Sequence, residues 1–197
     1  MKSFNIFKLS AFAFLCFTIV SCSQQDSGKQ SENNNVQESE VASQLFSGLK
    51  SKLNSDDKKQ ISTLTGLTYD AASKTFMTEG EGVEVQVVPV DINNDKTEDI
   101  FVITYSSFLY GNTGQGFSLF MKDESGKFKN TLSLPGIPEL LYESSESMPS
   151  IRVGGPGFDF PIYKWKSHSY KLVKNSGKVS KALSLEEAGQ QYTNSIK

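Results

Sequence analysis

The chain has 197 residues, of which 20 are Lys or Arg and 22 are Asp or Glu, so its formal net charge is −2 at pH 7. No stretch of the sequence gathers basic residues into a stripe. Binding to nucleic acid therefore has no electrostatic support, and we predict no nucleic-acid partner.

The first 21 residues have the pattern of a secretory signal peptide. An apolar run from Leu9 to Val20 follows a basic start and is shorter than the roughly 20 apolar residues of a membrane span. The segment ends in Ile19-Val20-Ser21-Cys22 and resembles the bacterial lipoprotein signal, with Ile19 where that motif usually has Leu. The resemblance implies a lipid on Cys22 as the membrane anchor, and Ser23 after it favours the outer membrane. The alternative is a short buried or interfacial helix with an incidental Cys.

The stretch after Cys22 is strongly polar, because residues 23–40 contain one apolar side chain, Val36. Such a composition buries too little surface to offset the entropy of ordering. We therefore predict that residues 22–40 form a flexible tether that begins at the lipidated Cys22. Residues 41–197 are long enough for a single domain with its own core. They contain no Cys, so the core has to hold the domain without a disulfide.

Helices are predicted at both ends of this domain. Val41, Leu45, Leu49 and Leu53 recur every four residues and predict one amphipathic helix. A second helix follows over residues 55–66, with Ser55 as N-cap, acids in the first turn and Gly66 as the stop. The sequence Ser184-Leu-Glu-Glu187 is a capping box that opens a C-terminal helix.

The residues between these helices favour strands. Short runs rich in β-branched and aromatic residues are separated by turn residues. Helices at the ends and strands between them predict an α+β fold, mainly an antiparallel sheet with two N-terminal helices and one C-terminal helix. The predicted strands are residues 67–70, 74–77, 83–90, 100–110, 117–122, 127–134, 150–153, 160–166 and 170–173.

An acid-rich turn, DINNDKTED at residues 91–99, separates two of these strands. Side-chain oxygens recur at Asp91, Asn93, Asp95 and Asp99, and Thr97 offers a backbone carbonyl. Calcium takes six to eight such oxygens, whereas zinc prefers Cys and His, which are missing here. The pattern predicts a structural calcium site, and the alternative is a solvated turn held by Asx hydrogen bonds without an ion.

The loop is not an EF-hand, because the twelfth position is Val102 and a strand follows in place of a helix. The pattern D-x-N-x-D-x-x-x-D followed by Ile resembles the calcium loop of FG-GAP (integrin alpha-like, or VCBS-type) repeats, over residues 85–104. One copy is present, so the resemblance implies the loop and not a propeller. Lys96 stands where the family usually has Gly at a positive φ. The order of motifs over residues 55–175 also resembles small bacterial secreted or lipidated proteins with one such loop and no established activity.

A second candidate ligand surface is the glycine-rich corner at residues 154–160. Phe158, Asp159, Tyr163 and Trp165 lie in or beside it and offer aromatic and acidic groups for a sugar or a peptide. Aromatic residues at strand spacing are more often part of a core, which is the alternative. The segment GNTGQG at 111–116 is followed by a strand and not a helix, so we expect a connection between strands and no phosphate site.

Catalytic residues are not evident. His168, the one histidine, lies in a predicted hairpin turn. Asp159 paired with Glu143 or Glu146 could in principle carry out glycosidase chemistry, but nothing in their sequence context favours it. The sequence thus predicts a non-enzymatic, lipid-anchored cell-envelope protein that binds or scaffolds an unknown protein or glycan. The alternative function is that of an envelope-acting hydrolase or a hydrolase inhibitor.

Overall fold

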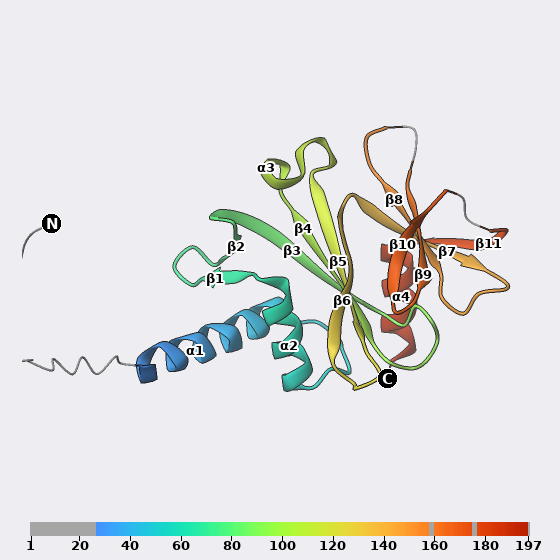
Figure 1. Cartoon of the computed structure of the whole chain (residues 1–197). Coiled ribbons are helices and arrows are strands. Elements are labelled where there is room, and N and C mark those ends of the chain that lie inside the picture. The colour runs from blue at the N-terminus through green and yellow to red at the C-terminus, as the bar shows by residue number, and fades with distance from the viewer. Residues whose placement is uncertain (1–26, 158–159, 175–176, 197) are drawn as a thin grey trace, which may run out of the picture.

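The computed structural model describes residues 27–157, 160–174 and 177–196 and arranges them in three layers (Figure 1). Two helices cover one face of a six-stranded sheet, and a five-stranded sheet covers its other face. All strand pairs are antiparallel. The predicted α+β class is confirmed, with mainly antiparallel strands, two N-terminal helices and a C-terminal helix.

Along the chain, two helices come first, the strands follow with one short helical stretch among them, and a helix comes last. The helices are α1 (Ser27–Leu45), α2 (Ser55–Thr65), α3 (Ser107–Tyr110), the 3-10 helix η1 (Gly111–Thr113) and α4 (Leu185–Ser195). The six-stranded sheet contains, in spatial order, β1 (Thr68–Asp70), β2 (Thr75–Thr78), β3 (Glu81–Val90), β4 (Asp99–Tyr105), β5 (Gln115–Lys122) and β6 (Phe128–Pro135). The five-stranded sheet has the order β10 (Ser169–Val173), β9 (Ile162–Lys166), β8 (Ser150–Gly154), β7 (Ile137–Glu143) and β11 (Val179–Ser184).

Strand β4 lies at the centre of the molecule and is buried on both faces. Phe101 and Ile103 point into a core between the two sheets, whereas Ile100 and Val102 point into a core under the N-terminal helices. Alternate side chains of a strand point to opposite faces. The continuous apolar run at this position is therefore explained by a layer on each side. We call the two clusters the inter-sheet core and the helix-side core.

Helix α1 differs from the sequence-based expectation at both ends. It begins at Ser27, so residues 27–40, predicted as tether, are helical, and it ends at Leu45. Its C-terminal turns are fixed because Val41 and Leu45 are buried in the helix-side core. A packed turn removes the cost of nucleation, and each further polar residue then joins the helix at little cost.

The predicted stripe from Val41 to Leu53 is only half helical. Gly48 adopts a left-handed φ of 69°, which ends the helical path. Leu53 still reaches the helix-side core, but from a segment outside any helix or strand. In α2 the cap is Asn54 and not Ser55, because the Asn54 side chain accepts from the Asp57 backbone N–H at 2.8 Å.

Three features of the strand region differ from the sequence-based expectation. The strand predicted for 100–110 ends at Tyr105, and Ser106 caps the short helix α3. Strand β7 contains Pro138, which disfavours a strand assignment. Strand β11 is exposed along most of its length and carries no alternating apolar pattern. Its place is decided by pairing with β7.

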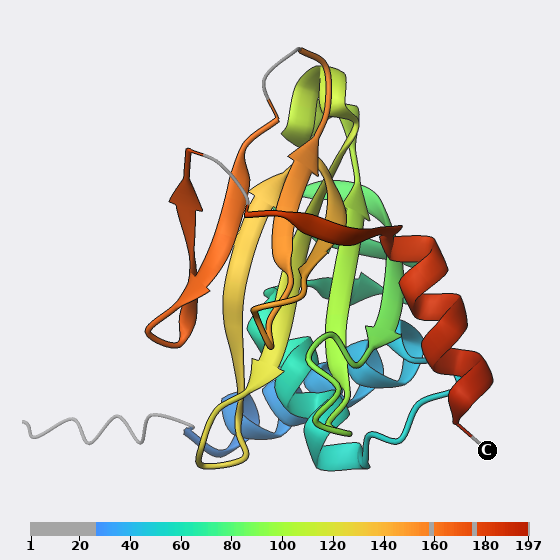
Figure 2. The same cartoon turned by 90° about the vertical axis from the view of Figure 1, so that its right-hand side faces the viewer.

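Helix α4 has the predicted capping box. The Ser184 hydroxyl accepts from the Glu187 N–H, and the Glu187 carboxylate accepts from the Ser184 N–H. The helix lies alongside β3 (Figure 2), and Gly189 makes this approach possible. A Cβ at Gly189 would lie 2.5 Å from Val88 Cγ1. None of the helices in the described residues is long and apolar enough to cross a membrane.

We expect Gly189→Ala to destabilise the protein by about 1 to 3 kcal/mol, as overpacked cores do. At a solvent-exposed position within a helix, the same change would stabilise the protein by about 1 kcal/mol. The sign reverses here because Val88 is buried and β-branched and has little rotamer freedom with which to move aside. Chemical denaturation of Gly189→Ala and of the exposed neighbour Gln190→Ala gives the comparison. A gain in stability for Gly189→Ala would contradict the close packing.

Candidate cation site in the acid-rich loop

The acid-rich loop, residues 91–99, connects β3 to β4 and is fixed to the core at its second residue. Val90 pairs with Asp99 at the base of the loop. Ile92 has no exposed surface and packs in the inter-sheet core. The polar residues on either side of Ile92 are thereby held at the surface.

The polar side chains of the loop bind its own backbone. Asp91 accepts from the N–H groups of Asp95 and Lys96, each at 3.0 Å. Asp95 accepts from the Thr97 N–H at 2.7 Å, and the Asn93 amide donates to Asp95 at 2.8 Å. The Asp95 bond to the Thr97 N–H is an Asx turn, in which a short acidic side chain binds the backbone two residues further on, whereas the Asp91 carboxylate reaches four and five residues ahead.

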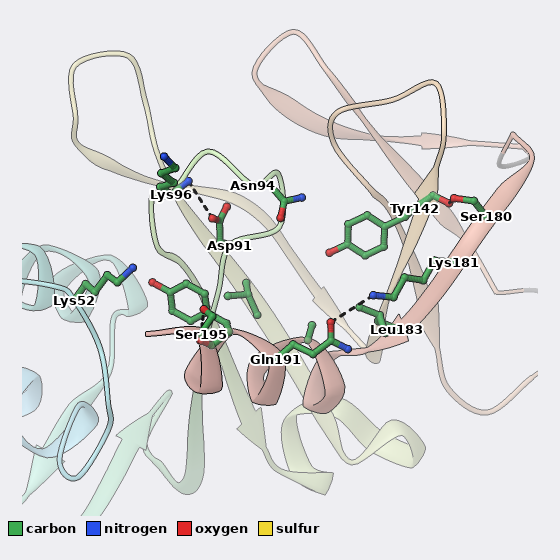
Figure 3. Close-up of a pocket in the computed structure, with 13 residues that line it drawn as sticks. Lys52, Asp91, Asn94, Lys96, Tyr142, Ser180, Lys181, Leu183, Gln191 and Ser195 are labelled. Carbon is green, nitrogen blue, oxygen red and sulfur yellow. Dashed lines mark hydrogen bonds between the residues drawn. The ribbon is translucent and has the colours of Figure 1, made fainter. Parts of the chain in front are cut away.

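The loop needs left-handed backbone at two non-glycine positions. Asn94 has a φ of 58° and Lys96 a φ of 71°. The expected positive φ at Lys96 is confirmed. The cost for a non-Gly residue is about 1–2 kcal/mol, and the hydrogen bond from the Lys96 N–H to Asp91 opposes it. Figure 3 shows the Lys96 side chain extending away from the Asp91 carboxylate, so its charge does not compete for the loop oxygens.

Asp99 is the most constrained acid of the loop, because only 2% of its surface is exposed. One carboxylate oxygen accepts from the Ile92 N–H at 3.1 Å. In the described part of the chain, no Lys, Arg or His nitrogen lies within ion-pair distance of Asp99. Burial, together with the negative charges of Asp95 and Asp91, raises the pKa of Asp99 to about 8. The site therefore lacks a positive charge.

Glu98, the preceding residue, points the other way. Its Oε2 accepts from the Ser51 hydroxyl at 2.8 Å and from the Lys52 N–H at 2.9 Å. Burial raises the pKa of Glu98, and its Oε1 is buried without a hydrogen-bond partner among the described residues. Glu98 thus joins the loop to the segment before α2. Nothing in the sequence links positions 98 and 51, so this role of Glu98 was not predictable from the sequence.

The loop lies between two hollows of the surface. The first, which we call the acidic hollow, has a volume of about 630 Å³. It brings the loop together with the β5–β6 turn and with Trp165 of β9. Lys122 also borders it but donates to Asp57 at 2.9 Å, away from the loop acids. The acidic and amide residues that line the acidic hollow are Asn93, Asp95, Asp99, Asp123 and Glu124, and Thr97 lies among them.

The second hollow, which we call the lysine pocket, has a volume of about 550 Å³ and lies on the other side of the loop (Figure 3). Asp91, Asn94 and Lys96 of the loop line it. The predicted ligand Asp91 therefore borders a different hollow from the other four predicted ligands. Over residues 27–157, 160–174 and 177–196, no group of three or more His, Cys, Asp or Glu side chains is arranged to hold a metal ion.

The residues of the loop fit a hard cation in two respects and differ in a third. All the side-chain donors are oxygens, as calcium prefers, and the buried Asp99 has no ion-pair partner among the described residues. Asp91 and Asp95 are, however, engaged with backbone N–H groups and do not converge with Asp99 on one centre. A cation held by Asn93, Asp95, Asp99 and the Thr97 carbonyl would supply the missing positive charge, and Asp91 would join these ligands only if it gave up its backbone hydrogen bonds.

The predicted aromatic surface is divided in the structure. Trp165 lines the acidic hollow and stacks edge-on against Tyr170, with ring centroids 5.2 Å apart. Tyr163 packs half-buried against the inter-sheet core, in accord with the alternative that it is a core residue. Phe158 and Asp159 lie outside the described residues.

The remaining catalytic candidates have other roles. Glu143 is buried and accepts from Lys164 and Ser150, each at 2.9 Å, and these bonds lower its pKa. A carboxylate held ionised in this way is a poor general acid. His168 is exposed in the β9–β10 turn, as predicted, with a φ of 65°. Residues 111–116 form η1 and the start of β5, so they connect elements as expected.

Comparison with protein-family models finds no matching family, and comparison with curated proteins and with solved structures finds no similar chain. The resemblance of the acid-rich loop to FG-GAP and VCBS calcium loops therefore stays a prediction. The geometry of the loop and of its two hollows is the basis for assigning a function.

Proposed function

We propose that this chain is a binding protein of the cell envelope, held at the membrane by a lipid on Cys22 and stabilised by a calcium ion in the acid-rich loop. Its role is to bind or scaffold a protein or glycan, without catalysis. The observation that carries the calcium assignment is the buried Asp99, which has no basic partner in the described part of the chain and lies beside two further acids. Buried charges in proteins are paired or bind metals.

The position of the acid-rich loop connects the proposed calcium ion to the binding of a partner. Residues of the loop form a wall of the acidic hollow and a wall of the lysine pocket. A calcium ion would reduce the repulsion among Asp91, Asp95 and Asp99 and hold both walls in place. The ion is thus structural, and the hollows beside it are the surfaces offered to a partner.

The anchor rests on the sequence of residues 1–22, which lie outside the described residues. Helix α1 begins at Ser27, four residues after Ser23. If Cys22 carries a lipid, the domain is therefore separated from the membrane by few residues and by the length of α1. Metabolic labelling with a fatty acid would test the anchor, since Cys22→Ala should abolish incorporation.

Calcium is expected to raise the melting temperature of the full-length protein by roughly 5 to 10 °C relative to excess chelator. A ligand at a hundred times its Kd stabilises by about 2.7 kcal/mol, and a domain of this size shifts by about 2–4 °C per kcal/mol. Asp95→Ala should lower the melting temperature in calcium and remove the calcium response. Asp95 is one of the three loop acids, with Asp91 and Asp99, whose mutual repulsion the calcium ion would reduce.

Asp70→Ala is the matched control for this experiment. Asp70 is an exposed Asx-turn residue that accepts from the Ala72 N–H at 3.0 Å and from the Ser73 hydroxyl at 2.7 Å, far along the chain from the loop. Its loss should leave the calcium response intact. An unchanged response in Asp95→Ala, or no response in the wild type, would reject the calcium site.

A further inference from the structure

The lysine pocket is bordered by six parts of the chain: the segment before α2, the end of β3, the acid-rich loop, β7, β11 and α4 (Figure 3). Its volume of about 550 Å³ falls within the range of about 300–1,000 Å³ that is typical of small-molecule sites. No pattern in the sequence predicts this pocket, because its residues come from distant positions in the chain.

Positive charge faces this pocket from opposite sides. Figure 3 shows Lys52 extending into it from one side and Lys181 from the other. Lys52 Nζ lies 5.6 Å from the centre of the Tyr192 ring, and Lys181 Nζ donates to Gln191 at 3.4 Å. Neither ammonium has a carboxylate within ion-pair distance in the described ranges.

Negative charge in the pocket is limited and already engaged. Asp91 is the one acidic residue among those that line it. Both Asp91 oxygens accept backbone N–H groups, from Asp95 and from Lys96. The pocket therefore has net positive charge, in a chain that has more acidic than basic residues.

Neutral polar groups complete the lining. The Tyr142 hydroxyl points into the pocket from β7, and the Gln191 amide lies on the α4 side (Figure 3). Tyr192 also lines the pocket, and its hydroxyl is buried without a hydrogen-bond partner among the described residues. A buried hydroxyl without a partner costs about 1–3 kcal/mol.

We propose that the lysine pocket binds a small organic anion with hydroxyl groups, of the sugar-acid or sugar-phosphate class. The anionic group lies between Lys52 and Lys181, because two ammonium groups attract a carboxylate or a phosphate alike. The hydroxyl groups face Tyr142 and Gln191, which both donate and accept hydrogen bonds. The proposal does not rest on the calcium site, since Lys52 and Lys181 lie outside the loop.

Isothermal titration of the full-length protein with glucuronate and with glucose 6-phosphate, at low ionic strength and in excess chelator, tests this inference. We expect saturable binding of at least one of these probes and none of neutral glucose. Lys52→Gln and Lys181→Gln should each weaken binding by about tenfold or more, since a hydrogen bond to a charged group is lost. A preference between the probes distinguishes a carboxylate ligand from a phosphate ligand.

Lys171→Gln is the control, because Lys171 is an exposed lysine on β10 that does not line the pocket. It removes the same charge and should leave binding unchanged. Equal weakening by Lys171→Gln would indicate general charge attraction and overturn the inference, as would the absence of saturable binding by both probes. Because chelator is present throughout, a failure here is distinguishable from a failure of the calcium response in melting.

Discussion

In the absence of calcium, the stability of the wild-type protein is expected to fall as the pH rises from about 5 to about 8, and Asp99→Asn should remove most of this fall. The pKa of Asp99 is about 8 in the folded protein and about 3.9 in an unfolded chain. Between these values the folded state holds a proton that the unfolded state releases. Stability is therefore greatest at the acidic side of the window and is lost as the pH rises, by at most about 1.4 kcal/mol per pH unit.

The Ile92 N–H lowers the pKa of Asp99, whereas the titratable side chains near Asp99 either raise this pKa or stay neutral. The negative charges of Asp91, Asp95 and Glu98 raise its pKa. Tyr142 and Tyr170 lie nearby, and burial raises the pKa of both phenols, so they remain uncharged in this range. The total loss from pH 5 to pH 8 is on the order of 3 kcal/mol. Asn keeps the shape of Asp and an oxygen for the Ile92 N–H.

Urea denaturation at several pH values in chelator measures this effect. Asp70→Asn is the control, because Asp70 is exposed and bonds lower its pKa. The control should retain the wild-type fall. A small residual slope in Asp99→Asn is expected, since burial also raises the pKa of Glu98. The same slope in wild type and Asp99→Asn would mean that Asp99 is ionised in the folded protein without an ion.

The same proton links pH to the proposed calcium ion. Calcium needs an ionised carboxylate, so binding should release the proton from Asp99 and become tighter as the pH rises through this window. The loss of stability in chelator and the gain of calcium affinity therefore have one cause, the buried Asp99 without a basic partner.

Ile92→Ala is expected to lower the free energy of unfolding by about 2 to 5 kcal/mol, the usual cost of truncating a buried aliphatic residue. Ile92 is completely buried in the inter-sheet core, although it belongs to a surface loop. Its backbone N–H also donates to Asp99. Loss of the side chain therefore removes core packing and loosens the hydrogen bond that holds the buried acid.

Ile92→Val is the control that separates the loss of core packing from any other effect of changing this loop residue. It keeps the branched shape and should cost only about 0.5–1.5 kcal/mol. Urea denaturation in chelator compares the two variants with the wild type. A loss below about 1 kcal/mol for Ile92→Ala would show that the loop is not fixed through this residue.

Local patterns determined much of the fold. The apolar run at 100–105 required burial on both faces, and the two cores on either side of β4 meet that requirement. The capping box at Ser184 and the stop at Gly66 act within one helical turn, so they are visible in the sequence. The turn at 91–99 was recognisable for the same reason, including the positive φ at Lys96.

Other elements depended on contacts that are distant in sequence. Strand β11 has little apolar patterning, and pairing with β7 decides its conformation. Helix α1 extends back to Ser27 because its far end is packed on the sheet. Leu53 belongs to the same apolar stripe as Leu45 but reaches the core from a non-helical segment, since a left-handed Gly48 intervenes.

The same distinction between local patterns and distant contacts applies to the candidate sites. By itself the sequence determined which residues of the acid-rich loop carry oxygens, because they are neighbours along the chain. Only the tertiary structure decided that Asp99 is buried without a basic partner in the described part of the chain, that Trp165 lines the acidic hollow, and that Lys52 and Lys181 face one pocket. The burial of a group and the charge around it depend on segments that meet only when the layers pack. Neighbouring residues in the sequence therefore cannot predict them.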